Sequence, residues 1–212
     1  MSISRRDMLA GAAGVALASS VNATIGSKFD KDRFIEDVQA ANRESDSQAA
    51  VTEVVAEAVH RPGEVVDKLG VPSKAGIQAL YNDESLTILN VTWAPLMVLL
   101  PHDHTMWATI GVYGGREDNI LWQREGDRIR ATGATSLSTR DVFMLEHDAV
   151  HSVVNPIEKI TGAIHVYGGD FFAPGRSEWD SETLERRPFD LEDALRTFRE
   201  ANERFDLNGA PN

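Results

Sequence analysis

Short, evenly spaced β-type segments fill the chain from Leu86 to Tyr167 and limit its possible folds more than any other feature. Each segment is rich in β-branched or alternating apolar residues, and turn residues such as Gly114-Gly115 and Asn155-Pro156 separate them. Many short strands at this spacing are typical of a closed barrel or jelly roll. The predicted strands cover residues 86–93, 106–113, 119–124, 128–131, 142–145, 149–154 and 163–167.

Helical segments flank this predicted barrel. Apolar residues recur at helical spacing between Phe29 and His60, with the polar stretch 42–47 dividing two helices, and residues 64–69 form a third. Asp190 is a suitable N-cap for a last helix. We therefore expect a helical segment at 24–74, a mainly β barrel at 75–175, and a C-terminal loop, helix and loose tail at 176–212.

The charge balance and the missing cysteines narrow the possible partners. The chain carries 21 basic and 33 acidic side chains, for a net charge of −12. This excess repels nucleic acids and anionic membrane surfaces, so we expect a small-molecule substrate, with a local donor for any anionic group on it. With no cysteine in 212 residues, disulfides and thiolate sites are excluded, and any metal must be held by His, Asp or Glu.

The first 23 residues have the pattern of an export signal. Residues 4–9, Ser-Arg-Arg-Asp-Met-Leu, resemble the twin-arginine motif, and a mild apolar run leads to Val21-Asn22-Ala23, which is similar to a cleavage site. The apolar run is shorter than the roughly 20 residues needed to span a bilayer. We expect a periplasmic protein without a membrane span. If 1–23 is instead only an N-terminal tail, the protein is cytoplasmic. The oligomeric state is not predicted.

The sequence Pro101-His102-Asp103-His104 offers two imidazoles to one point. On a strand, side chains two residues apart share a face, so His102 and His104 form a chelating pair and Asp103 points away. The alternative is a polar strand end without a metal.

A second fragment, from His151 to Asn155, extends the pattern. A His-x-His pair followed by glycines, here Gly111 and Gly114-Gly115, together with a His-x-x-x-Asn ending, resembles the two motifs of the cupin superfamily. This resemblance implies a double-stranded β-helix, the jelly-roll barrel of cupins. It also implies that the motifs lie on neighbouring strands, so that His151 completes a three-nitrogen metal site with His102 and His104.

The missing acidic ligand points to one branch of that superfamily. Ordinary cupins place a glutamate three or four residues after the second histidine, where this chain has Ala108 and Thr109. In this respect the chain resembles the thiol dioxygenases, cysteine dioxygenase and 3-mercaptopropionate dioxygenase. The resemblance implies Fe(II) on three neutral histidines. Such a site stays dicationic, favours a thiolate and keeps open positions for substrate and dioxygen.

The segment 162–167 extends the likeness. Thiol dioxygenases place a Ser-x-His-x-Tyr relay beside the iron, and here Ala163, His165 and Tyr167 share one face of a predicted strand. His165 and Tyr167 match as catalytic residues, with Tyr167 able to donate a hydrogen bond to dioxygen or substrate. Ala163 replaces the serine and puts strict cysteine or mercaptopropionate specificity in question. The alternative is a buried tyrosine beside a satisfied histidine.

Substrate-binding residues are indicated more loosely. The family holds its substrate carboxylate with an Arg or Gln about two dozen residues before the first metal histidine, which corresponds to Gln78. Arg116 and Arg124 are alternatives. Trp107, next to the histidine pair, is expected to line the pocket.

The resulting hypothesis is a non-haem Fe(II) dioxygenase that converts a small thiol to a sulfinate. Two alternatives remain open. One is a cupin isomerase or hydrolase that uses Zn, Mn or Ni as a Lewis acid. The other is a non-catalytic periplasmic protein that binds a metal or a small molecule.

Overall fold

The computed structural model describes residues 28–209, which form two β-sheets with helices at both ends of the chain. The helices are α1 (Lys31–Ala41), α2 (Ser47–His60), α3 (Pro62–Leu69) and α4 (Leu191–Arg204), with a short 3₁₀ turn at Leu207–Gly209. The strands are β1 (Gly76–Asn82), β2 (Thr87–Trp93), β3 (Val98–Asp103), β4 (Ala108–Gly114), β5 (Arg116–Glu125), β6 (Arg128–Ser138), β7 (Val142–Leu145), β8 (Val150–Val154), β9 (Thr161–Tyr167), β10 (Ser177–Trp179) and β11 (Arg186–Pro188).

The strand order is that of a jelly roll. One sheet has the order β1-β2-β9-β4-β7 and the other β11-β10-β3-β8-β5-β6, with every pairing antiparallel. Strands β2 to β9 therefore supply four neighbours to each sheet, the two-sheet arrangement of eight-stranded jelly rolls. The predicted double-stranded β-helix of the cupin type, mainly β with helices at the N-terminus and one at the C-terminus, is confirmed.

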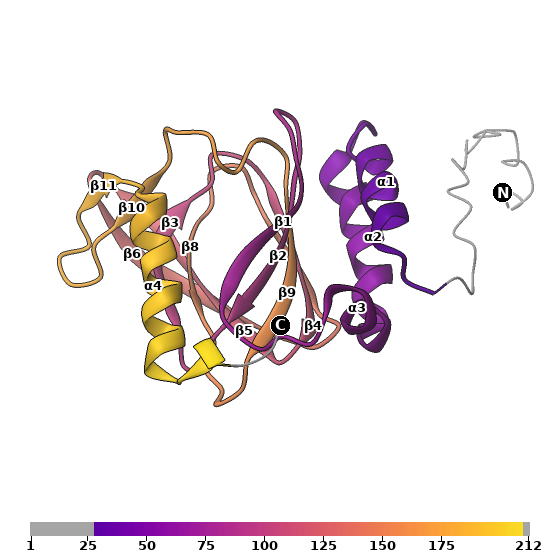
Figure 1. Ribbon diagram of the computed structural model, residues 1–212. Helices are drawn as coiled ribbons and strands as arrows, with labels where there is room; N and C mark the ends of the chain where they lie inside the picture. The colour runs from indigo at the N-terminus through magenta and orange to yellow at the C-terminus, as the bar shows by residue number, and fades with distance from the viewer. Residues whose placement is uncertain (1–27, 210–212) are drawn as a thin grey trace, which may run out of the picture.

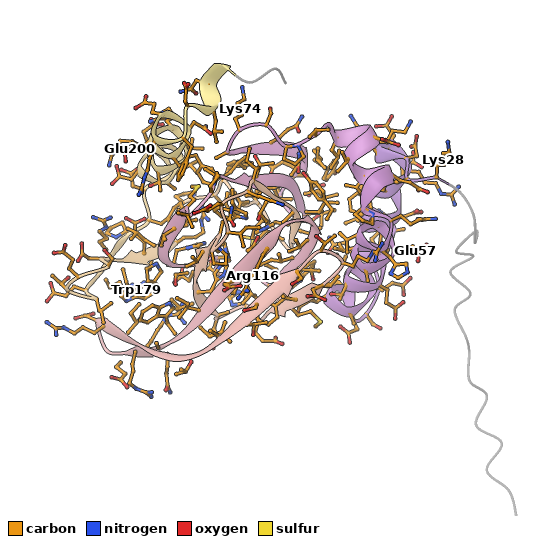
Figure 2. All side chains as sticks on the ribbon, turned by 90° about the horizontal axis from the view of Figure 1, so that it is seen from below. Lys28, Glu57, Lys74, Arg116, Trp179 and Glu200 are labelled. Atoms are coloured by element: carbon orange, nitrogen blue, oxygen red, sulfur yellow. The ribbon has the colours of Figure 1, made fainter. Side chains whose placement is uncertain are left out.

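Helices cover the five-stranded sheet on one side. Leu89 and Val91 of β2 face the core between the sheets, whereas Ile88 packs with the residues of α1, α2 and α3. Both faces of β2 are thus covered, which explains why it is almost continuously buried. Figure 1 shows these three helices on one side of the barrel and α4 on the other, and Glu57 and Glu200 in Figure 2 mark the same separation.

Two glycines after the histidine pair are required by close packing and by a turn. A Cβ on Gly111 would lie 2.4 Å from Cγ1 of Val55, so its absence lets α2 lie against β4. Gly115 joins β4 to β5 with φ +83°, a left-handed conformation that glycine adopts without strain. The glycine spacing read from the sequence therefore serves helix packing and the β4–β5 turn.

The structure corrects three details of the sequence-based expectation. Strands β10 and β11 lie in the segment expected to be a loop, and β1 had not been predicted as a strand. The tail expected to be loose packs on the core through Phe205 and Leu207. The predicted export signal, 1–23, lies outside the described residues, and no helix within 28–209 is long and apolar enough to cross a bilayer.

Asn155, the last residue of the second histidine motif, holds a barrel corner together. It is fully buried, and its Nδ2 donates to the carbonyl oxygens of Trp93, Ala94 and Lys159 at 3.2, 2.8 and 2.8 Å. One amide thus links the end of β2 to the loop after β8. The His-x-x-x-Asn motif therefore combines a histidine of the site with a structural asparagine.

Replacing Asn155 with alanine is expected to lower the free energy of unfolding by about 2–3 kcal/mol, because buried carbonyls would lose their donor. Urea unfolding followed by circular dichroism measures this change. Asn208→Ala, at an exposed position, is the matched control and should change stability by less than about 0.5 kcal/mol. Equal effects of the two substitutions would contradict the role given to Asn155.

Candidate metal centre

Three histidines from two neighbouring strands converge between the sheets. His102 of β3 pairs in register with His151 of β8, and His104 lies one residue beyond the end of β3. All three side chains are buried, and each offers a ring nitrogen within 4.8 Å of the other two. The structure thus brings together the three residues predicted as metal ligands.

Hydrogen bonds fix which nitrogen of two rings can bind a metal. His102 Nδ1 lies 2.8 Å from the Leu100 carbonyl oxygen, which can only accept, so Nδ1 carries the proton and Nε2 keeps its lone pair. The same reasoning applies to His151, whose Nδ1 lies 2.6 Å from Oδ1 of Asn119. His151 Nε2 lies 2.9 Å from His104 Nε2, so the lone pair of His151 Nε2 faces the ring of His104.

Burial keeps these imidazoles neutral. It lowers the pKa of His102 to about 4, against a smaller upward effect of the hydrogen bond to Leu100. Burial also lowers the pKa of His104 and of His151 well below the ordinary value, and repulsion between the rings acts in the same direction. A neutral imidazole with a free nitrogen is the form that binds a metal.

The donor set fits a divalent metal ion that accepts nitrogen ligands. Within residues 28–209 no carboxylate belongs to the cluster. Asp103 points away and accepts from Arg124 Nη2 at 2.9 Å and from the Ser177 amide at 2.8 Å. Nδ1 of His104 is buried and has no hydrogen-bond partner in the described part of the chain. The identity of the metal does not follow from this geometry.

His165 and Tyr167, the predicted catalytic pair, lie beside the cluster. His165 Nδ1 is 3.1 Å from the Tyr167 hydroxyl, and the Tyr167 ring packs 4.8 Å from that of His104. Burial raises the pKa of Tyr167 well above its ordinary value, so the phenol keeps its proton at neutral pH. Ala163 lies on the same inward face, as expected from the alternation.

A carboxylate that the sequence reading did not identify completes this group. Glu117 of β5 is fully buried, and its Oε2 lies 3.1 Å from His165 Nε2 and 2.7 Å from Trp93 Nε1. Burial by itself would raise the pKa of Glu117, but the attraction and hydrogen bonds of His165, Asn119 and Trp93 outweigh it and lower that pKa. His165 thus has a buried carboxylate as the partner of its Nε2.

A small cavity of about 30 Å³ adjoins the cluster and has mostly apolar walls. Helix α4 contributes to these walls, and Phe198 stacks on Trp93 with ring centroids 5.2 Å apart. The polar side chains are His102, His151, His165 and Tyr167, and the remaining lining residues are Ile77, Leu89, Val91, Trp93, Leu99, Val153, Phe171, Phe189, Leu191, Ala194 and Phe198.

Arg176, also missed from the sequence, supplies a buried positive charge next to the cavity. Its guanidinium lies 4.3 Å from the ring centre of Phe171 and 4.1 Å from that of Phe189, two residues of the cavity wall. Nε and Nη1 are buried without hydrogen-bond partners in the described structure, and burial lowers the pKa of the group. The only sequence signal was an arginine in a segment read as loop.

The residues predicted for substrate binding lie elsewhere. Gln78 accepts from Asn90 Nδ2 at 3.4 Å in a separate groove, and its neighbour Ile77 lines the cavity instead. Trp107 packs with the helix-side core and against Gly168. Of the two alternatives, Arg116 pairs with Asp118 and Arg124 pairs with Asp103. The structure does not bring these four residues to the histidines.

Comparisons with known proteins add similarity of fold only. Neither a protein-family model nor a curated protein matches this chain. A solved structure of a conserved protein with a double-stranded β-helix domain from Klebsiella pneumoniae is 14% identical, covering 50% of this chain and 79% of that one, at a TM-score of 0.41. A cupin 2 conserved barrel domain protein from Salinispora arenicola is 18% identical over 44% and 74%, at a TM-score of 0.36.

A further solved structure belongs to an enzyme. The DMSP lyase DddQ from Ruegeria pomeroyi is 14% identical, covering 49% of this chain and 50% of the lyase, at a TM-score of 0.39. Likenesses this remote indicate nothing about the reaction of this chain, which its own residues must decide.

Because the buried imidazoles are neutral in the folded protein, we expect the stability of the metal-free protein to fall at acidic pH. Between the ordinary histidine pKa of about 6.5 and the value of about 4 in the folded protein, His102 binds its proton only after unfolding. The unfolded state then carries more protons, so the free energy of unfolding falls as the pH is lowered from 6.5 towards 4, by about 3 kcal/mol from His102 alone.

Urea unfolding of the metal-free chain at several pH values measures this slope. The matched variant His102→Leu should have a shallower dependence on pH over the same range. A variant with the same slope as the wild type would show that His102 is not held neutral by burial.

Proposed function

We propose that the protein is a metal-dependent cupin oxygenase that uses Fe(II) and dioxygen to oxidise a small thiol to a sulfinate, with both oxygen atoms of dioxygen added to sulfur. The observation that carries this proposal is the composition of the site: three buried neutral imidazoles, and no carboxylate joining them within residues 28–209. A metal on such a ligand set keeps its full positive charge, and a thiolate is a suitable additional ligand for it.

The ligands would be Nε2 of His102 and of His151, together with a ring nitrogen of His104. Ferrous iron held there would supply open coordination positions and the one-electron chemistry that oxygen activation requires. The chain itself contributes a cavity with mostly apolar walls and the Tyr167 hydroxyl, whose proton is retained at neutral pH. We propose that Tyr167 and His165 position the reacting groups at the cluster.

Arg176 supports the proposal that the substrate also carries an anionic group. A buried guanidinium with two unpaired nitrogens is costly unless a partner arrives, and a carboxylate matches its planar geometry. Phe171 and Phe189 hold the guanidinium between their rings beside the cavity wall. We therefore assign anion binding to Arg176 in place of Gln78. The export-type segment 1–23 supports the additional proposal that the protein acts in the periplasm.

Oxygen uptake by the iron-loaded protein with a panel of small thiols tests the reaction. His151→Ala should reduce thiol-dependent uptake at least about 100-fold, because the site loses one of three ligands. The matched control is His147→Ala, four residues earlier and exposed, which should retain uptake. Equal uptake by the wild type and His151→Ala would refute the dioxygenase proposal. Zinc, manganese or nickel supporting turnover without oxygen would favour the isomerase or hydrolase alternative.

The role of Arg176 has its own test. Arg176→Gln should raise KM for thiols that carry a carboxylate by about 10- to 100-fold, the value of a lost hydrogen bond to a charged group, while kcat changes less. Thiols without an anionic group should bind equally well to both proteins. Arg116→Gln, at the surface pair with Asp118, serves as the control. An equal loss for both kinds of thiol would contradict anion binding by Arg176.

A further inference from the structure

Glu117 stands at the branch point of a buried hydrogen-bond network. Trp93 and His165 meet its Oε2, as described above, and Asn119 Nδ2 lies 3.1 Å from its Oε1. Glu117 and Asn119 are two residues apart on β5, so they share the inward face, and both are fully buried. The intervening Asp118 points outward and pairs with Arg116.

The first branch runs to the metal cluster and has a single consistent direction. An ionised carboxylate only accepts hydrogen bonds, so the Asn119 amide must turn its NH₂ group towards Glu117. Its oxygen then faces His151, at 2.6 Å from Nδ1. Because that oxygen also only accepts, the proton of His151 must sit on Nδ1, and Nε2 is left free to bind a metal.

The second branch runs to the tyrosine. His165 Nε2 must carry the proton that Glu117 Oε2 accepts, which leaves His165 Nδ1 facing the Tyr167 hydroxyl. Trp93 Nε1 can only donate, so it reinforces the acceptor role of the same oxygen. Electrostatics agrees with this assignment, since the surroundings of Glu117 favour its ionised form.

We propose that Glu117 is a positioning residue whose single buried carboxylate fixes the proton positions of two histidines, His151 through Asn119 and His165 directly. It thereby presents His151 Nε2 to the metal and His165 Nδ1 to Tyr167. Hydrogen-bond partners of this kind commonly orient metal-binding histidines. The inference deepens the proposed function and rests on its metal site, but the network itself exists in the chain without a metal.

Substitution of Glu117 by Gln makes the proposal testable, because the side chain keeps its shape but gains an NH₂ group. If this NH₂ takes the place of Oε1, it faces the NH₂ of Asn119, and two donors cannot pair. The Asn119 amide must then flip and turn its NH₂ towards His151 Nδ1. If it takes the place of Oε2, it faces the N–H groups of Trp93 and His165, so the proton of His165 must move from Nε2 to Nδ1. In both cases, the ring nitrogen that carries the proton changes in at least one of the two histidines.

Long-range proton–nitrogen spectra of the ¹⁵N-labelled full chain report which ring nitrogen carries the proton. They would be recorded without metal and with zinc, and the signals assigned with His151→Gln and His165→Gln. The wild type should show the proton of His151 on Nδ1 and that of His165 on Nε2. Glu117→Gln should change at least one pattern, and the control Glu125→Gln, exposed on the same strand, neither. Unchanged patterns for both rings in Glu117→Gln would overturn the proposal.

Asn119→Ala interrupts one branch only, and keeps the proposal testable if Glu117→Gln does not fold. Asn119→Ala should change which ring nitrogen of His151 carries the proton and lower zinc affinity about 10-fold or more. The proton of His165 should stay on Nε2, as in the wild type. If the proton position of His151 did not change, or if that of His165 changed equally, the branched arrangement would be overturned. These readouts need no turnover. If the iron-loaded protein oxidises no thiol, the proposed function is refuted. The spectra of the metal-free chain would still test the role of Glu117.

Discussion

The structure depends on one constraint, the burial of three uncharged imidazoles whose ring nitrogens face one another. Each buried polar ring needs a partner or a ligand, and the barrel provides these through strand register. Pairing of β3 with β8 sets His102 opposite His151, and the end of β3 brings in His104. Burial in such a cluster disfavours protonation of the imidazoles, and their ring nitrogens could hold a divalent cation between the two packed sheets.

Two buried charged side chains, Glu117 and Arg176, lie in the surroundings of this cluster. Glu117 lies on β5 in contact with His165, and Arg176 lies between two aromatic rings of the cavity wall. The carboxylate organises hydrogen bonds within the chain, whereas the guanidinium has nitrogens that the described residues leave unpaired. We therefore infer different roles for them: Glu117 orients the protein's own rings, and Arg176 receives part of the substrate. Because both side chains are buried, their electrostatic interactions are stronger than they would be in water.

Local patterns in the sequence predicted much of the fold and the histidines that cluster in it. Alternation over two residues predicted the chelating pair, and short β-branched segments between turns predicted the barrel. Long-range register was not readable. Glu117 meets His165 across 48 residues, which no local motif encodes. Successive side chains of a strand point to opposite faces, so an offset of one position places a residue on the wrong face. In β1, Ile77 and not its neighbour Gln78 lines the cavity. Arg176 was missed because it precedes a three-residue strand in a segment without periodicity.

X-ray absorption spectroscopy of the iron-loaded full chain, prepared without oxygen, together with its metal stoichiometry, tests the three-histidine site directly. We expect one Fe(II) per chain with three imidazole ligands, lost on substitution of His102, His104 or His151 and retained in His147→Ala. A carboxylate among the protein ligands, fewer than three imidazoles, or iron binding that survives the loss of His151 would contradict this site.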